Sequence, residues 1–244
     1  LENYNILEFQ QISDSFNEMT VRIETLIKEV YETQLLVKEA RLQYLQAQIN
    51  PHFMFNVLTM IAIKVKKHRD EELYQTVTSF AGLMRGKLFR RNEVEIKLKE
   101  EMEIAGFYLY LQSERFKDII TYNIEWESDE IKECYVPRLC IEPIVENAVI
   151  HGLEPKGTEG RIRVAIREAS EDSINIVVED DGVGFNVNEM DDRKDNKNPR
   201  VGVMNIQRLI RNLYGDKYGV LFQSEIGKGT IVTVCLPMRK DRTV

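Results

Sequence analysis

The chain has 244 residues, of which 43% are hydrophobic and 30% are charged, and its formal net charge is -7 at pH 7. This length exceeds that of a typical single domain, and the composition is that of a protein with packed cores, so we expect two domains or one domain with an extended arm. The acidic balance, without a basic stripe interleaved with aromatic residues, disfavours nucleic acid as the main partner.

The sequence also indicates the compartment. Its three cysteines, Cys134, Cys140 and Cys235, are odd in number and lack the spacing of metal ligands, which favours a reducing environment. No run of about 18 apolar residues and no signal peptide is recognised, so we expect no membrane span within this sequence. The sequence begins inside a helical pattern, which suggests a fragment of a longer protein.

A heptad pattern dominates the first fifth of the chain. From Ile12 to Tyr44 the apolar residues recur in alternating steps of four and three, interrupted only by Thr33, and no glycine or proline precedes Pro51. Such a seam predicts a long helix that pairs with a partner helix, most simply the same segment of a second copy in a parallel dimer. The alternative is a long helix that folds back on its own domain.

Pro51 and His52 then interrupt the helical pattern side by side. A proline within a helix costs about 3 kcal/mol, so we expect a compensating role. A histidine with an ordinary pKa of about 6.5 is largely neutral at physiological pH, and its neutral imidazole is a nucleophile. The alternative is a helix hinge with a capped or buried histidine.

A helical hairpin is predicted after His52. An apolar helical pattern over residues 53–65 leads to a charged turn at 66–70, and a second pattern covers 73–88. A further helical block follows at 98–116. We therefore assign residues 31–117 to a coiled coil and a helical hairpin.

Near residue 118 the apolar period changes from that of helices to that of strands. Five stretches have the alternation or apolar run of strands, and two helical segments lie between them. The strand-like stretches are 120–126, 162–166, 174–178, 220–223 and 230–236, and the helical segments are 139–151 and 201–213. Residues 118–244 are therefore predicted to form a separate α+β domain, a sheet covered by helices on one face.

The first of three polar patches in this domain lies on a predicted helix. Glu146, Asn147 and His151 interrupt an otherwise apolar segment. The carbonyl oxygen of Asn147 is a hard ligand that Mg²⁺ accepts alongside waters and phosphate oxygens. The alternative for Asn147 is a core amide whose hydrogen bonds are all made within the protein.

The second patch is the sequence Asp-Asp-Gly-Val-Gly at residues 180–184, directly after a predicted strand. The carboxylate of Asp180 can accept a hydrogen bond from an exocyclic amine, while Gly182 and Gly184 let the backbone close around a flat ring. The alternative is a simple turn.

The third patch combines Gly227, Gly229 and Thr230, ahead of the last strand, with Gly202 at the start of the helix that contains Asn205. Glycines ahead of a helix expose N–H groups that can bind phosphate. The polar interval 186–200 has no apolar period, which predicts a functional lid or disorder. Together, the three patches in this order predict a nucleotide site.

These residues resemble the ATP-binding domain shared by histidine kinases, gyrase-type ATPases, Hsp90 chaperones and MutL proteins. The sequence Asn-Pro-His-Phe-x-Phe-Asn within residues 48–56, with the block 137–152, extends the resemblance over almost the whole chain to sensor histidine kinases of the LytS/YesM type. The resemblance implies a long dimeric coiled coil and helical hairpin, followed by an α+β ATP-binding sandwich.

The resemblance also implies what surrounds this chain. Residues 1–30 are similar to the second helix of a HAMP linker, so a membrane anchor is expected upstream, and the chain would be the cytoplasmic part of a plasma-membrane sensor. A homodimer and the receiver domain of a response regulator are the expected partners.

The resemblance implies that His52 accepts the γ-phosphoryl group of Mg-ATP and passes it to an aspartate of the response regulator. Asn147 would hold Mg²⁺, and Asp180 would read the amino group of adenine. Asn56 and Glu146 are further catalytic candidates. The remaining residues expected to bind the nucleotide or to shape its pocket and lid are His151, Gly182, Gly184, Gly202, Asn205, Gly227, Gly229 and Thr230.

Three positions depart from the family pattern. Arg200 replaces the first glycine of Gly-x-Gly-Leu-x-Asn, Ile150 stands where a lysine is common, and Phe53 follows His52 where many histidine kinases have an acid. These departures keep open a catalytically weak or silent nucleotide-binding scaffold. An ATP hydrolase would need an acid one turn before Asn147, where Pro143 stands.

Overall fold

The computed structural model describes residues 19–20, 22–28, 30–31, 33–34, 37, 51–88, 93–117, 119–170, 172–186 and 199–242. The chain divides into two compact units, residues 1–50 and 51–244. In the first unit the described residues between 19 and 37 are helical, as the heptad pattern predicts. The rest of the expected coiled coil, with most of the segment expected to be a HAMP helix, lies outside the described residues.

The described apolar residues of the heptad seam are exposed in a single copy of the chain. Their exposed fractions lie between 45% and 61%, for Met19, Ile23, Leu26, Val30 and Val37. A stripe of large apolar side chains in water is unfavourable, so it calls for a partner surface. None of the described helices is both long enough and apolar enough to cross a membrane.

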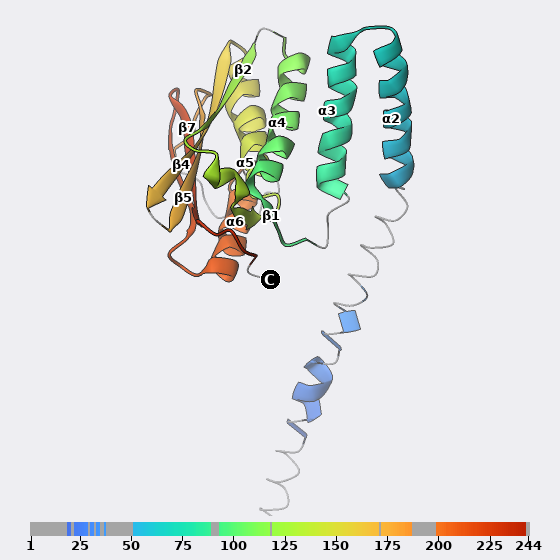
Figure 1. Ribbon diagram of the computed structural model, residues 1–244. Coiled ribbons are helices and arrows are strands. Elements are labelled where there is room, and N and C mark those ends of the chain that lie inside the picture. The colour runs from blue at the N-terminus through green and yellow to red at the C-terminus, as the bar shows by residue number, and fades with distance from the viewer. Residues whose placement is uncertain are drawn as a thin grey trace, which may run out of the picture. The chain divides into compact units, whose positions relative to one another are not determined.

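The second unit begins with the predicted helical hairpin, formed by α2 (Pro51–Lys67) and α3 (Glu71–Leu88) (Figure 1). The turn between them ends at Asp70, whose Oδ1 accepts a hydrogen bond from the backbone N–H of Leu73 at 3.0 Å. This bond caps the start of α3. Farther along, the guanidinium of Arg85 lies 3.9 Å from the ring centre of Phe55, which ties α3 to α2.

The predicted sheet follows, with the strand order β2-β4-β5-β7-β6. β2 and β4 are parallel and the other neighbours are antiparallel. A separate antiparallel pair joins β1 to β3. In chain order the elements are β1 (Glu95–Lys97), α4 (Leu98–Arg115), β2 (Ile120–Trp126), η1 (Glu130–Glu133), β3 (Tyr135–Pro137), α5 (Glu142–Asn147), η2 (Ala148–Leu153), η3 (Glu154–Lys156), β4 (Gly160–Ser170), β5 (Ser173–Asp180), α6 (Pro199–Tyr214), β6 (Gly219–Glu225) and β7 (Gly229–Pro237).

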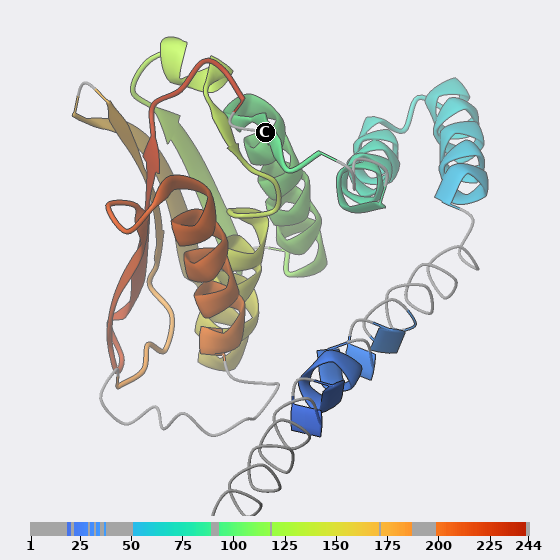
Figure 2. The same cartoon turned by 90° about the horizontal axis from the view of Figure 1, so that it is seen from below.

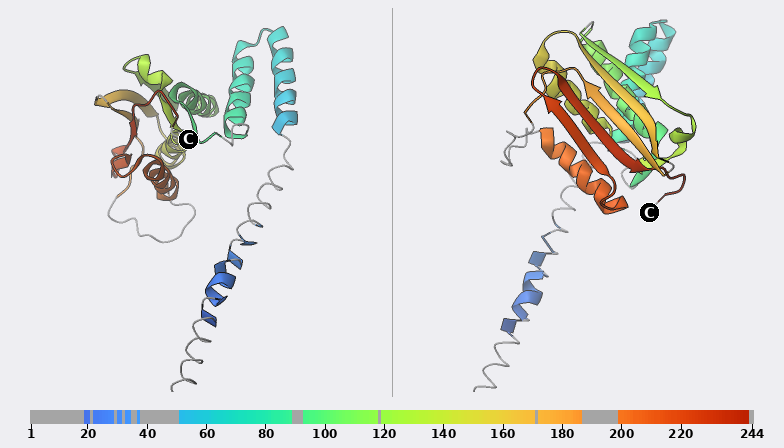
Figure 3. Two further views of the ribbon diagram at one scale, coloured as in Figure 1. Left: turned by 60° about the horizontal axis from the view of Figure 1, so that its bottom comes forward. Right: turned by 90° about the vertical axis from the view of Figure 1, so that its left-hand side faces the viewer.

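The helices α4, α5 and α6 cover one face of this sheet (Figure 2), as predicted. The right-hand view of Figure 3 looks onto the other face, which these helices leave uncovered. Alternate strand residues point to the covered face because the strand period is two. Ile162, Val164 and Ile166 of β4 are fully buried there, beside Ile174 and Ile176 of β5.

Helix α4 belongs to this core and not to the hairpin alone. Leu98, Ala105 and Leu109 are fully buried in the same cluster as the sheet residues, and β1, just before α4, pairs with β3. The expected boundary at residue 118 therefore cuts through one hydrophobic core. An apolar stripe identifies a helix but not the core against which it packs. We propose that the sheet domain starts near Glu95.

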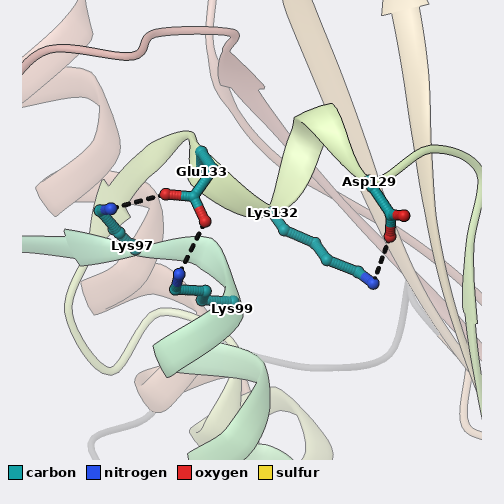
Figure 4. A network of polar contacts seen from close by, with 5 residues as sticks. All are labelled: Lys97, Lys99, Asp129, Lys132 and Glu133. Atoms are coloured by element: carbon teal, nitrogen blue, oxygen red, sulfur yellow. Dashed lines mark hydrogen bonds and ion pairs between the residues drawn. The ribbon is translucent and has the colours of Figure 1, made fainter.

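A surface network fastens η1 to the start of α4 (Figure 4). The Nζ atoms of Lys97 and Lys99 lie 2.5 and 2.7 Å from the two carboxylate oxygens of Glu133. Hydrogen bonds from Lys97 and then Lys99 lower the pKa of Glu133 to about 2. Asp129 and Lys132 form a second pair nearby at 2.5 Å. All these groups are solvent-accessible, so salt screens their attraction.

A buried carboxylate holds the start of α5 in place. Glu101 of α4 is fully buried, and its two oxygens accept hydrogen bonds from the backbone N–H groups of Leu139 and Ile141, each at 2.9 Å. The N-cap residue of α5 is Ile141, whose apolar side chain cannot accept a hydrogen bond from the N–H groups at the start of the helix. Burial raises the pKa of Glu101, and these backbone hydrogen bonds oppose the shift.

We predict that E101A destabilises the sheet domain. Removal of the carboxylate leaves the buried N–H of Ile141 and the part-buried N–H of Leu139 without their acceptor, at about 1–3 kcal/mol each. Urea unfolding should therefore show a loss of about 2–6 kcal/mol in the free energy of unfolding. The matched control is E103A, an exposed glutamate of the same helix. Equal stabilities of the two variants would contradict this account of Glu101.

Candidate functional site

A pocket that is open to solvent lies between the α5–η2 segment, the start of α6 and the strands β5, β6 and β7. Its polar lining residues include Asn147, His151, Asp180 and Thr230, four of the predicted site residues. The other described lining residues are Ile144, Ala148, Gly152, Val178, Phe185, Val203, Met204, Phe222 and Val232.

Asp180, the last residue of β5, places a buried carboxyl in this pocket. It is 5% exposed, and its Oδ1 accepts a hydrogen bond from the N–H of Gly182 at 2.9 Å. Burial raises the pKa of Asp180 to about 6, while hydrogen bonds from the N–H groups of Gly182 and Thr230 oppose the shift. A carboxyl held in this way remains able to accept a hydrogen bond from a ligand.

Glycines let three backbone segments meet around Asp180. A Cβ atom on Gly182 would clash with the backbone of Gly152, and one on Gly152 would lie 2.6 Å from Oδ1 of Asp180. Gly229 has φ 95°, and a Cβ atom on it would clash with the carbonyl oxygen of Asp180. A Cβ atom on Gly184 would likewise clash with the carbonyl oxygen of Glu225. Of these glycines, Gly152 lines the pocket itself, and the others allow the close backbone approaches beside it.

Asn147 and His151 enter the pocket from a helix whose winding changes at the site. Asn147 is the last residue of α5, and the π-helical segment η2 carries His151 and Gly152. A π-helical turn is wider than an α-helical one and is frequent at functional sites. A Cβ on Gly202 would lie 3.5 Å from Nδ2 of Asn147, so the start of α6 approaches this amide closely.

The structure does not bring every predicted site residue into the pocket. Glu146 is 38% exposed and lies 3.8 Å from Nζ of Lys87. Asn205 and Asn56 are exposed, and Gly227, with φ 79°, occupies the open turn between β6 and β7. All the described lining residues come from between Ile144 and Val232, so α2 contributes none of them.

Two predictions lie partly outside the described residues. His52 belongs to α2, but its side chain is not described. Of the expected lid at 186–200, residues 187–198 lie outside the description, as does the side chain of Arg200.

The apolar walls of the pocket were missed by sequence reasoning. Val178, Met204 and Phe222 fit the period of their own strand or helix, so nothing distinguished them from core residues. Phe185 carried a usable signal, because a large aromatic residue directly after Gly184 has no function in a simple turn. Its ring lies 6.4 Å from that of Phe222, centre to centre.

The pocket therefore combines apolar walls with a buried hydrogen-bond acceptor, and it has an amide near the start of a helix. This donor and acceptor set fits a flat heteroaromatic ring that carries an amino group, with anionic groups near the N-terminus of α6.

Comparisons with known proteins agree with this chemistry. The family model for histidine kinases matches residues 40–120, and the model for histidine kinase-, DNA gyrase B- and HSP90-like ATPases matches residues 137–240. The chain belongs to the histidine kinases and carries their ATP-binding domain.

Among curated relatives, the chain is similar to the sensor histidine kinase YesM of Bacillus subtilis, with 32% identity over 96% of this chain and 40% of that protein. It is also similar to the sensor histidine kinase YpdA of Escherichia coli, with 29% identity over 84% of this chain and 37% of that protein. The chain thus spans about two fifths of the length of these relatives.

Among solved structures, the histidine kinase domain of a blue-light activated kinase from Erythrobacter litoralis aligns with a TM-score of 0.44 at 18% identity. The alignment covers 72% of this chain and 84% of that one.

We predict a pH signature for Asp180. Its pKa rises on folding from its ordinary 3.8 to about 6. A raised carboxyl pKa adds stability that is fully present below pH 3.8 and is lost as the pH rises through about 6. In D180N this loss is absent, so the stability of D180N relative to the unsubstituted chain should rise by about 2 kcal/mol between pH 4 and pH 7.

Urea unfolding over this pH range measures the difference. The control is D181N, because Asp181 is the neighbouring carboxylate and its side chain is 54% exposed. D181N keeps the Asp180 carboxyl, so the loss of stability that Asp180 causes as the pH rises should remain in this variant. Parallel pH curves for D180N and the unsubstituted chain would contradict the assignment.

Proposed function

We propose that this chain is the catalytic part of a sensor kinase that transfers the γ-phosphoryl group of ATP to His52 and then to an aspartate of a response regulator. The observation that carries this proposal is the buried Asp180 carboxyl in an apolar pocket of the ATP-binding domain. A histidine kinase model matches the segment that contains His52.

In this proposal Asp180 reads the base of ATP. Its carboxylate accepts a hydrogen bond from the exocyclic amine of adenine, while Gly182 and Gly184 keep the adjoining backbone close to the ring. The side chains of Ile144, Val178 and Phe222 supply the apolar walls on which a flat base packs.

The phosphates would lie toward the start of α6. The backbone N–H groups near Gly202 and the positive end of the helix dipole favour anions there. The side of the pocket opposite α6 would be formed by Gly227, Gly229 and Thr230. The edge of the pocket would be completed by Asn205 and His151. Asn147 would hold Mg²⁺ through its carbonyl oxygen, and the ion would supply charge neutralisation at the phosphates.

His52 would act as the nucleophile through a neutral imidazole nitrogen. An N–P bond forms as the bond between the γ-phosphorus and the bridging oxygen of ADP breaks, and the electron pair leaves with ADP. Asn56, one helical turn after His52, would orient the imidazole. Glu146 is the remaining candidate for accepting the imidazole proton, but its ion pair with Lys87 at 3.8 Å favours a structural role.

The same proposal covers the partners. The exposed apolar seam between Met19 and Val37 would pair with a second copy in a parallel homodimer. The receiver domain of a response regulator would then take the phosphoryl group from His52. A membrane anchor upstream would place this chain on the cytoplasmic side of the plasma membrane, and we expect no role for nucleic acid.

A catalytically weak or silent nucleotide-binding scaffold is the second candidate. Two observations favour it: Arg200 stands where a glycine is usual, and Ile150, where a lysine is common, is 38% exposed. An arginine could still contact phosphate through its fork of donors, but lid closure would differ.

Labelling with γ-³²P-ATP and Mg²⁺ separates the two candidates. We predict that the chain gains an acid-labile phosphoryl label that H52Q abolishes, because only the imidazole of His52 accepts the group. H68Q is the control, since His68 is exposed in the turn between α2 and α3 and should label normally. Nucleotide binding without any label would favour the scaffold, and label retained in H52Q would refute the role of His52.

A further inference from the structure

The end of α3 is seated closely on the sheet domain. Gly82 and Gly86 of α3 face α4, and a Cβ atom on Gly82 would clash with the ring of Phe107. A Cβ on Gly86 would lie 2.6 Å from Cγ1 of Ile104. These glycines thus allow α3 to lie directly against α4, where Figures 1 and 2 show the two helices side by side.

Arg138 fastens the last turn of α3 to the segment that leads into α5. Its Nη2 donates hydrogen bonds to the carbonyl oxygens of Gly86 and Lys87, at 2.6 and 2.8 Å. The last carbonyls of a helix lack partners within the helix and carry its negative dipole end, so a guanidinium is well suited to them. The contact therefore holds only while α3 keeps this position.

Lys87 continues the same junction onto α5. Its Nζ lies 2.8 Å from Oε1 of Glu142, which is 2% exposed, and 3.8 Å from Oε2 of Glu146. Residues 142 and 146 are one helical turn apart and share a face of α5. Asn147, which lines the nucleotide pocket, follows Glu146 directly. One ammonium group on α3 thus contacts two carboxyl groups of the helix that presents Asn147.

The energetics of this ion pair suit a reversible contact. If Lys87 alone is removed, the buried carboxylate of Glu142 loses its counter-charge, and such a loss is strongly destabilising. If α3 leaves as a whole, both groups regain water, so the net contribution of the pair is small. Burial raises the pKa of Glu142 and the hydrogen bond from Lys87 opposes it, as expected for a carboxyl that depends on its partner.

We infer that Lys87 is a positioning residue that couples the seating of α3 to the placement of Asn147 in the nucleotide pocket. The inference rests on the proposed function, which gives Asn147 its role toward Mg²⁺ and the phosphates. With α3 seated, Glu142 and Glu146 are fixed and α5 holds the amide ready for its ligand. Since coupling between two sites is reciprocal, Mg-ATP in turn favours the seated position of α3.

The first test needs no nucleotide. Hydrogen exchange of the whole chain should show that K87M speeds exchange of the amides in residues 84–88 and 139–147 by about tenfold, because the junction opens more often. The matched control is K117M. Lys117 pairs with Glu72 at the other end of α3, at 2.6 Å, where both side chains are 64% exposed. K117M should leave these amides unchanged.

The second test measures the affinity for ATP with Mg²⁺ and with EDTA. We expect K87M to weaken binding about fivefold in Mg²⁺ and by less than about twofold in EDTA, since Asn147 acts on the ion and the phosphates. K87R keeps the charge and should retain most of the affinity. The double variant K87M/E142Q removes both charges, so it folds without an unpaired buried carboxylate and should lose the same Mg²⁺-dependent affinity.

The outcomes are distinguishable. Faster exchange with an unchanged Mg²⁺-dependent affinity would make Lys87 merely structural and would overturn the inference. Unchanged exchange in K87M and in the double variant would overturn it as well. Failure of the unsubstituted chain to bind ATP would refute the proposed function itself, whatever the exchange experiment shows.

Discussion

Burial of the Asp180 carboxyl is the constraint on which the nucleotide-binding domain depends. The strand end that carries Asp180 can be desolvated only because the N–H groups of Gly182 and Thr230 bind the carboxyl. Gly152 and Gly229 must lack side chains so that the neighbouring segments can approach it. Because the pKa of Asp180 is about 6, its ionised form destabilises the folded chain at neutral pH. A role in binding the amine of a ligand would explain why a carboxyl stands there.

Two further buried carboxylates act on the helix opposite Asp180. Glu101 accepts the N–H groups that precede α5, and Glu142 binds Lys87 of α3. The contacts of Glu101 order the start of α5. The contact of Glu142 with Lys87 forms only when the hairpin helix α3 is in place. The helix that carries Asn147 is thus fixed to its own domain at one point and to the hairpin at another.

Much of this could be predicted from the sequence, for a physical reason. Asp180 and Asn147 are polar residues in apolar contexts, and alternation or a short run of apolar residues revealed the five strands of the main sheet. The strands β1 and β3 have three residues each, too few to show a period. Helix α4 has the same period as the hairpin helices, so only its contacts reveal which core it joins. Met204 and Phe222 became visible as pocket walls only through the fold.

The central claim is that Asp180 reads the amino group of adenine in ATP, and nucleotide discrimination tests it most directly. Inosine triphosphate has the same phosphates and nearly the same ring, but a carbonyl oxygen replaces the exocyclic amine. Titration of both nucleotides into the chain with Mg²⁺ should show ATP binding about 30-fold more tightly or better, because an unpaired buried acceptor costs about 2 kcal/mol or more. Equal affinities for the two nucleotides would contradict the account.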